Sequence, residues 1–371
     1  MSTKQANEKA IYPGREYPEK NEEKIAADIV KLLQAQMLRM YAKNKAKQLR
    51  QIHPKMNGCV KAEFIIESNL PVELKVGLFK EAKSFPAWIR FSNGDTKPLP
   101  DWKKDVRGFA IKIMNVPGEK LVESKKNCGN HDFILMNTKY FVSRKVKDFH
   151  RILKVVTVPY RPGTFFPKLF AVLSSLPILA RAGKAKIKCR HPFEIFYFST
   201  VPYRFGDETK AVKYAVLPSE KNILEYTDTT NPDFLRANMV STLLKHEIFY
   251  DFFIQFQTDA EKMPIEDPTV VWDSPLIKVA TIRIPIQIFD TPEQNDFGDN
   301  LSFNAWHALP EHRPIGNFNR ARKKIYQEMY TFRHLHNNLE DIEPEASPDF
   351  FNDIYNNTYN DTYIKQNGST K

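Results

Sequence analysis

The chain has 371 residues, of which 42% are hydrophobic and 12% aromatic, so it can bury a large core as one large domain or two ordinary ones. Its three cysteines, Cys59, Cys128 and Cys189, are too few and too widely spaced for a disulfide framework or a zinc signature. The net charge of +11 suits nucleic acid, an anionic membrane surface or an anionic ligand, but no nucleic-acid motif accompanies it. We therefore expect a globular protein without dedicated nucleic-acid binding.

The beginning of the chain is polar, and residues 1–22 are expected to form a mobile leader. This leader lacks the apolar segment of a secretory signal, and nowhere in the chain do eighteen apolar residues follow one another. Widely spaced thiols are typical of a reducing compartment. These features favour a cytoplasmic location.

A long helix is predicted next. Residues 22–51 contain neither glycine nor proline, and their apolar side chains, Ile25, Ile29, Leu33 and Met37 among them, recur at helical spacing. We expect this amphipathic helix to open a single domain at 23–337. The following tail, 338–371, is polar and rich in asparagine, and is expected to be poorly ordered or to wrap the surface.

From about residue 58 the apolar period becomes two. Trp88, Arg90 and Ser92 share one face of a predicted strand, while Ile89 and Phe91 share the other. Further strands are predicted within 106–114, 132–142, 210–218 and 278–289, the last alternating through Ile282, Ile284, Ile286 and Ile288. Few neighbouring strands are separated by a crossover-length helix. The pattern indicates an α+β protein built on an antiparallel sheet or barrel.

The segment 161–188 departs from this scheme. It is strongly apolar, is interrupted by Pro167 and Pro177, and ends in a run of lysines. One interpretation is a pair of helices in the core or in a homo-oligomer interface, because apolar helical stripes are usually buried. The other is a helix pair that lies on a membrane surface, with the cations as its flank.

A basic helix is predicted after Asn317 or Asn319. On it Arg322, Tyr326 and Arg333 are spaced i, i+4 and i+11, which places them on one stripe. Nearby positive charge stabilises a phenolate, and phenolate is a ligand for ferric iron. An exposed basic helix with a half-buried tyrosine would give the same pattern.

Eight segments taken in order give a more specific signal. They are RQIHPKMNG, WIRFSNGD, DVRGFAIKI, DFILMNT, PYRFGD, DPTVVWDSPLIKV, LSFNAWHALPEHRP and RARKKIY. Together they resemble the signatures of the haem catalase superfamily, and are most similar to its small catalase-related members. The resemblance covers about residues 50–333. It implies an antiparallel β-barrel that binds haem b, with surrounding helices and without the C-terminal flavodoxin-like domain of full-length catalases.

The resemblance also implies roles for individual residues. His53 matches the distal histidine that exchanges protons with a bound peroxide, and Ser92 matches the serine that orients its ring. Tyr326 matches the axial ligand of the iron, with Arg322 keeping it anionic. The propionate-binding arginines and the apolar walls of the haem pocket are matched by Arg50, Arg90, Arg333, Phe141 and Phe149.

One departure from the family affects the expected substrate. An ungapped match puts Met136 where catalases have the asparagine that accompanies the distal histidine, and Asn137 one residue later. A one-residue slip turns a strand side chain to the opposite face, so only a bulge would let Asn137 take the place of the catalase asparagine beside the distal histidine. We expect a peroxide-metabolising enzyme that takes fatty-acid hydroperoxides as well as or instead of hydrogen peroxide, including an isomerase of the allene oxide synthase type. The alternatives are an ordinary small catalase or peroxidase and a non-catalytic haem-binding protein.

Overall fold

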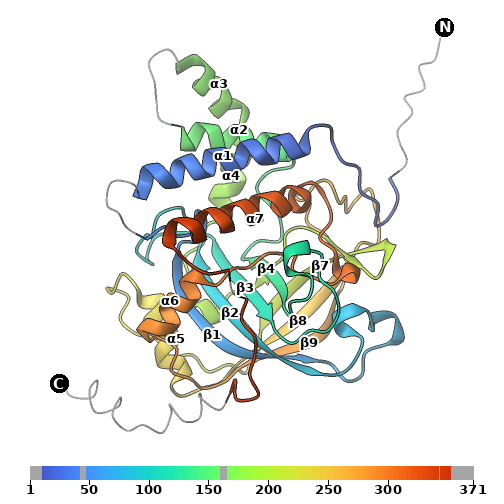
Figure 1. The fold of residues 1–371 in the computed structure, drawn as a ribbon, viewed down its shortest axis with the longest axis vertical. Coiled ribbons are helices and arrows are strands. Elements are labelled where there is room, and N and C mark those ends of the chain that lie inside the picture. Colours follow the sequence, from blue (N-terminus) through green and yellow to red (C-terminus); the bar gives the residue numbers. More distant parts are fainter. Residues whose placement is uncertain (1–10, 42–46, 159–164, 342, 352–371) are drawn as a thin grey trace.

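The computed structural model describes residues 11–41, 47–158, 165–341 and 343–351 (Figure 1). Its strands are β1 (Lys55–Ile66), β2 (Ser84–Asn93), β3 (Arg107–Ile113), β4 (His131–Met136), β5 (Tyr197–Phe198), β6 (Tyr203–Phe205), β7 (Asp207–Pro218), β8 (Ile248–Phe256) and β9 (Leu276–Ile284). They pair in the order β5-β4-β3-β2-β1-β9-β8-β7-β6, and β5 also pairs with β7, which closes eight of them into a barrel. All these pairings are antiparallel. The predicted antiparallel barrel is confirmed.

Side chains alternate between the barrel interior and its outer face. On β2, Ile89 and Phe91 are fully buried in the interior, where the Phe91 ring meets that of Phe109 edge-on with 4.9 Å between centroids. Such aromatic pairs add packing energy beyond the area they bury. Arg90 and Ser92 have the opposite orientation. The period-two pattern therefore assigned both faces of this strand correctly.

Helices surround the barrel: α1 (Glu22–Tyr41), α2 (Val146–Thr157), α3 (Phe165–Ser174), α4 (Leu176–Ala185), α5 (Phe234–Leu243), α6 (Pro292–Asn300) and α7 (Asn317–Asn337). Figure 1 shows α7 lying across the barrel beside β2, β3 and β4, with α1 and α2 beyond it and α3 outermost. None of the described helices has the length and apolarity needed to cross a membrane. The layer between the strands and α7 holds the candidate site.

Three predicted elements were too long, and one of them is the strand within 132–142, which ends at Met136 as β4. The first helix ends at Tyr41, and residues 47–51 are not helical; the intervening 42–46 lie outside the described residues. The side chain of Asn337 holds this stretch away from a helix, because it bonds both the N–H of Gln48 at 2.7 Å and its carbonyl at 2.9 Å. Strand β9 ends at Ile284, because the next residue is a proline that cannot donate to the ladder.

Part of the predicted leader, 1–22, packs against the body of the protein. Glu16 accepts hydrogen bonds from the backbone of Gly316 at 2.8 Å and from Arg320 at 2.6 Å. These contacts connect the leader to the start of α7. Residues 1–10 lie outside the described part, and the mobility of the leader stays a prediction.

The beginning of the predicted tail, 338–371, wraps the surface. Glu343 accepts a hydrogen bond at 2.9 Å from the buried Lys112 of β3. Burial by itself raises the pKa of Glu343, but Lys112 and His307 outweigh it and lower that pKa to about 2. The tail is therefore attached to the barrel by a buried charge. Residues 352–371 lie outside the described part.

Candidate functional site

A cavity of about 290 Å³ lies between the outer face of the barrel and α7. This volume is at the lower end of the range for small-molecule pockets, about 300–1,000 Å³. Ten of the eleven predicted site residues line it: His53, Ser92, Met136, Arg50, Arg90, Phe141, Phe149, Arg322, Tyr326 and Arg333. The fold thus gathers residues that are up to 283 positions apart in the chain, from Arg50 to Arg333, around one cavity.

His53 is held tightly in an unusual backbone conformation. It lies just before β1 with a φ of 62°, a region that residues with a side chain seldom adopt. Its Nδ1 is 3.0 Å from Oγ of Ser92, and Arg90 donates to its backbone carbonyl at 3.1 Å. Gly108 lies against the ring, since a Cβ at that position would be 2.5 Å from Nδ1. These contacts fix the orientation of the imidazole and leave Nε2 as the ring nitrogen available to a substrate.

The surroundings of His53 also determine its charge. Burial, reinforced by the positive charges of Arg90 and Arg50, lowers the pKa of His53 to about 3. At neutral pH the ring is therefore uncharged. A neutral imidazole beside a cavity is able to accept a proton.

The buried Arg90 and Arg333 and the half-buried Arg50 line the cavity with little negative charge to balance them. Arg90 donates to the carbonyl of Gly298 at 3.3 Å and lies 3.8 Å from the carboxylate of Asp299, and Arg333 donates to the carbonyl of Asp299 at 2.5 Å. Nε and Nη2 of Arg50 are buried and find no hydrogen-bond partner among the described residues. Burial and the neighbouring guanidinium groups lower the pKa of Arg50 well below its ordinary value, and burial lowers the pKa of Arg333 to about 10. The cluster is poised to bind an anion.

Helix α7 supplies the opposite wall. It begins at Asn317, one residue before the earlier of the two predicted starts, and turns Arg322, Tyr326 and Arg333 toward the cavity. The guanidinium carbon of Arg322 is 6.0 Å from the centroid of the Tyr326 ring, and Arg322 donates to Oδ1 of Asn319 at 3.4 Å. The predicted stripe therefore faces a cavity, whereas an exposed basic helix would have turned it to solvent.

The apolar wall is an aromatic cluster. The ring of Phe141 is 5.8 Å from that of Phe149 and 4.4 Å from that of Phe318. All three rings line the cavity. This arrangement suits a flat apolar ligand.

The structure separates Met136 from Asn137. Strand β4 pairs with β3 without a bulge, and Met136, opposite Gly108, lines the cavity. Asn137 faces away: its Oδ1 accepts from the backbone N–H of Arg107 at 2.7 Å, and its Nδ2 donates to the carbonyl of Ala185 at 2.9 Å. The bulge on which a role for Asn137 depended is absent from this strand pair, so the predicted site includes one residue that the fold does not bring to it.

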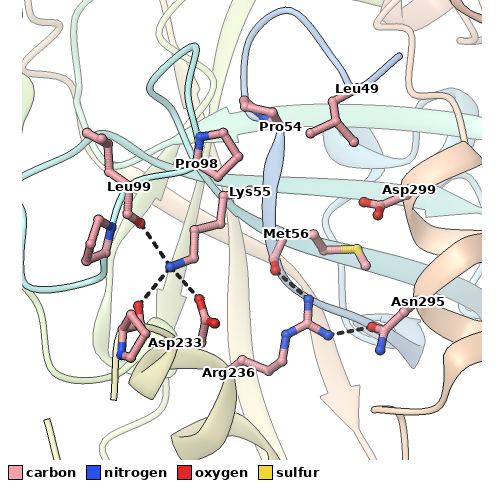
Figure 2. A pocket seen from close by; sticks show the side chains of 12 residues that line it. Leu49, Pro54, Lys55, Met56, Pro98, Leu99, Asp233, Arg236, Asn295 and Asp299 are labelled. Carbon is pink, nitrogen blue, oxygen red and sulfur yellow. Dashed lines mark hydrogen bonds and ion pairs between the residues drawn. The ribbon is translucent and has the colours of Figure 1, made fainter. Parts of the chain in front are cut away.

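A second cavity of about 550 Å³ lies next to the first (Figure 2). Its cations already have partners: Lys55 is 2.7 Å from the carboxylate of Asp233, and Arg236 donates to Asn295 at 2.5 Å. Asp299 lines this cavity and also pairs with an arginine of the first one. Because the candidate acid–base and anion-binding groups line the first cavity, we place the functional site there.

The sequence matches no protein-family model and no curated protein. Solved structures are more informative. A fungal catalase superposes with a TM-score of 0.58 and 18% identity over 80% of this chain and 61% of that one. A bacterial catalase superposes with a TM-score of 0.55 and 17% identity over 83% of this chain and 62% of that one. Catalase A from Saccharomyces cerevisiae superposes with a TM-score of 0.56 and 19% identity over 87% of this chain and 71% of that one. The chain has a catalase-type fold. It spans less than two thirds of the fungal and bacterial catalases.

The residues of the cavity fit a haem group. Haem carries two carboxylates, and the partly unsatisfied, half-buried Arg50 stands beside Arg90 and Arg333 with one carboxylate near them. Tyr326 offers an oxygen ligand, which is one of the ways in which proteins hold haem iron. The aromatic wall suits the macrocycle. These three features line one cavity of a barrel with a catalase-type fold.

Two residues of the site escaped the sequence analysis. Gly108 lies in the quoted segment DVRGFAIKI, and a glycine inside a predicted strand often marks the close approach of another group. That signal was available. Asp299, the carboxylate beside the arginines, lies at the end of a polar helix, where nothing in the local pattern sets it apart.

Proposed function

We propose that this chain binds haem b in the cavity under α7 and uses it to metabolise peroxides. The observation that carries the proposal is that a histidine–serine pair, a tyrosine and three arginines converge on one cavity of a catalase-type barrel. In this proposal Tyr326 would hold the haem iron as tyrosinate, and Arg322 would stabilise its negative charge. Arg50, Arg90 and Arg333 bind the propionates.

The proposed chemistry assigns His53 a proton-transfer role. When bound, the haem supplies the redox chemistry that cleaves a peroxide O–O bond. Neutral His53 accepts the proton of the peroxide at Nε2 and delivers it to the other oxygen of the same bond, which is general acid–base catalysis. Ser92 holds Nδ1 and thereby keeps Nε2 directed at the substrate.

We propose fatty-acid hydroperoxides as the preferred substrates. Met136 lines the cavity and presents a soft apolar side chain that is a weak hydrogen-bond acceptor. Such a wall positions hydrogen peroxide poorly but gains about 0.8 kcal/mol for each methylene of an alkyl chain that it buries. Analysis of the products distinguishes the two reactions open to such a substrate, reduction and an isomerisation of the allene oxide synthase type.

The haem assignment is tested by replacing Tyr326. Tyr326→Phe should abolish the phenolate charge-transfer bands of the purified protein or prevent haem binding. Tyr330→Phe is a matched control, because Tyr330 lies one turn further along α7, lines the same cavity and bonds Asp341. Identical visible spectra of the wild type and Tyr326→Phe would refute the assignment.

The activity is tested with both kinds of peroxide. The wild type should consume a long-chain fatty-acid hydroperoxide with a higher kcat/KM than hydrogen peroxide, and His53→Ala should lower the rate of reaction about 100-fold or more with haem still bound. Vigorous oxygen evolution without consumption of the lipid hydroperoxide would make the protein an ordinary catalase. A haem-loaded protein that reacts with neither substrate would be a non-catalytic haem-binding protein.

A further inference from the structure

Helix α3 turns its apolar stripe toward solvent. Phe166, Leu169, Phe170 and Leu173 are spaced i, i+3, i+4 and i+7, which places them on one face. Their exposed fractions are 79%, 42%, 73% and 53%. A helix that packed on the core would bury this face. The interpretation of 161–188 as a pair of core helices is therefore wrong for α3, while residues 161–164 lie outside the described part.

Helix α4 follows α3 in the chain and also exposes apolar side chains. Leu176 and Leu179 are 53% and 38% exposed, whereas Ile178 and Ala185 are buried against the protein. Only one side of α4 is thus used for packing. Figure 1 shows α3 on the far side of α1 and α2 from the barrel, so the apolar side chains lie on a projecting part of the molecule.

The sequence segment that contains these helices carries charge of one sign. Residues 149–193 contain nine lysines and arginines and not a single aspartate or glutamate, so most of the net charge of +11 arises in this segment. Lys184 and Lys188 are exposed and form no ion pair within the described residues, while Lys186 pairs with Asp95. Exposed apolar side chains and unopposed cations on one segment of the chain match the acyl chains and head groups of an anionic lipid leaflet.

We propose that α3 and α4 form a docking surface for an anionic membrane. Each of these helices has 10 residues and is about 15 Å long, half the thickness of the hydrocarbon core, so the pair lies in the interface. Phe170, Leu169 and Leu173 enter the acyl region, and Lys184 and Lys188 contact the phosphates. Docking needs no haem and is independent of the proposed chemistry.

Vesicle co-sedimentation of the full-length protein tests the proposal. The chain should bind vesicles of 70% phosphatidylcholine and 30% phosphatidylglycerol, and bind pure phosphatidylcholine at least tenfold more weakly. The double variant Phe170→Ser, Leu173→Ser should lose binding. Neutralising Lys184 and Lys188 to glutamine should weaken it about fivefold for each charge removed.

The control removes equally exposed apolar side chains elsewhere. Val72→Ser with Leu335→Ser changes residues that are 82% and 72% exposed and should leave vesicle binding unchanged. Equal binding by the Phe170 and Leu173 variant and this control would overturn the proposal. A second result would also overturn it: the wild type binds neither kind of vesicle and forms a dimer, detected by light scattering, that the Phe170 and Leu173 substitutions dissociate. The surface would then bind a second copy of the chain.

Discussion

The most direct test of the site geometry is a substitution at Gly108, which removes no functional group. Gly108 of β3 is paired with Ser92 on one side and Met136 on the other, so it lies in the middle of the wall beneath His53. A Cβ at Gly108 would lie 2.5 Å from Nδ1 of His53 and 2.7 Å from Oγ of Ser92. Both distances are far below ordinary contact. Gly108→Ala must therefore displace the imidazole or the strand.

The size of the effect follows from these contacts. Overpacking a well-packed site costs about 1–3 kcal/mol, and loss of the bond between His53 and Ser92 adds about 1 kcal/mol. The left-handed conformation of His53, with φ 62°, leaves it little freedom to move aside within its own segment. We expect Gly108→Ala to lower the free energy of unfolding by about 2–4 kcal/mol and the rate of reaction with peroxide by about 100-fold.

Urea denaturation and rapid-mixing kinetics measure the two effects. A third measurement is an NMR titration of His53, whose pKa should rise from about 3 toward its ordinary value as the displaced ring meets water. Gly183→Ala in α4 is the control, because nothing lies within 4 Å of the added Cβ; it should leave stability unchanged or raise it by about 0.5–1 kcal/mol. Wild-type stability and wild-type kinetics in Gly108→Ala would refute the reasoning.

Three further outcomes are expected. Glu343→Gln should lower the free energy of unfolding at pH 7 by up to about 3 kcal/mol, and the difference should vanish as the pH falls from the ordinary value of the carboxyl toward 2, where the wild-type carboxylate is protonated too. The urea midpoint of the wild type should fall as the pH drops from 6.5 toward 3. Burial lowers the pKa of His53 to about 3 and those of His191 and His312 to about 4, so in this range the unfolded chain binds more protons than the folded chain. Met136→Asn should shift the ratio of kcat/KM values toward hydrogen peroxide, and an unchanged ratio in steady-state assays would mean that Met136 does not select the substrate.

Local patterns were sufficient for much of the fold. The alternation around Arg90 and Ser92 separated the two faces of β2, and the helical spacing of Arg322 and Tyr326 placed both on one stripe of α7. These predictions depend on side-chain direction within one element, which sequence period determines. Helix length was harder, because the backbone of Gln48, within the predicted helix, is bonded by Asn337, almost 300 residues further along the chain.

The site required information beyond any single element. The convergence of Arg50, Arg90 and Arg333 depends on the closure of the barrel and on the end of α6, and the sequence indicated it only through the resemblance to catalases. The outward orientation of Phe170 was also beyond the sequence. An apolar stripe has the same spacing whether it faces a core or solvent, so only the packing of α3 distinguishes the two.

The placement of Met136 and the anchoring of α4 are connected through Asn137. The amide of Asn137 joins the backbone of Arg107 to the carbonyl of Ala185, the last residue of α4. A bulge that brought Asn137 into the cavity would break both hydrogen bonds, each contributing about 0.5–1.5 kcal/mol, and would release the end of the helix that carries Leu176. Asn137 cannot point into the cavity and bond the end of α4 at the same time. In this fold an apolar residue beside His53 therefore accompanies the attachment of the end of α4 to β3 through Asn137.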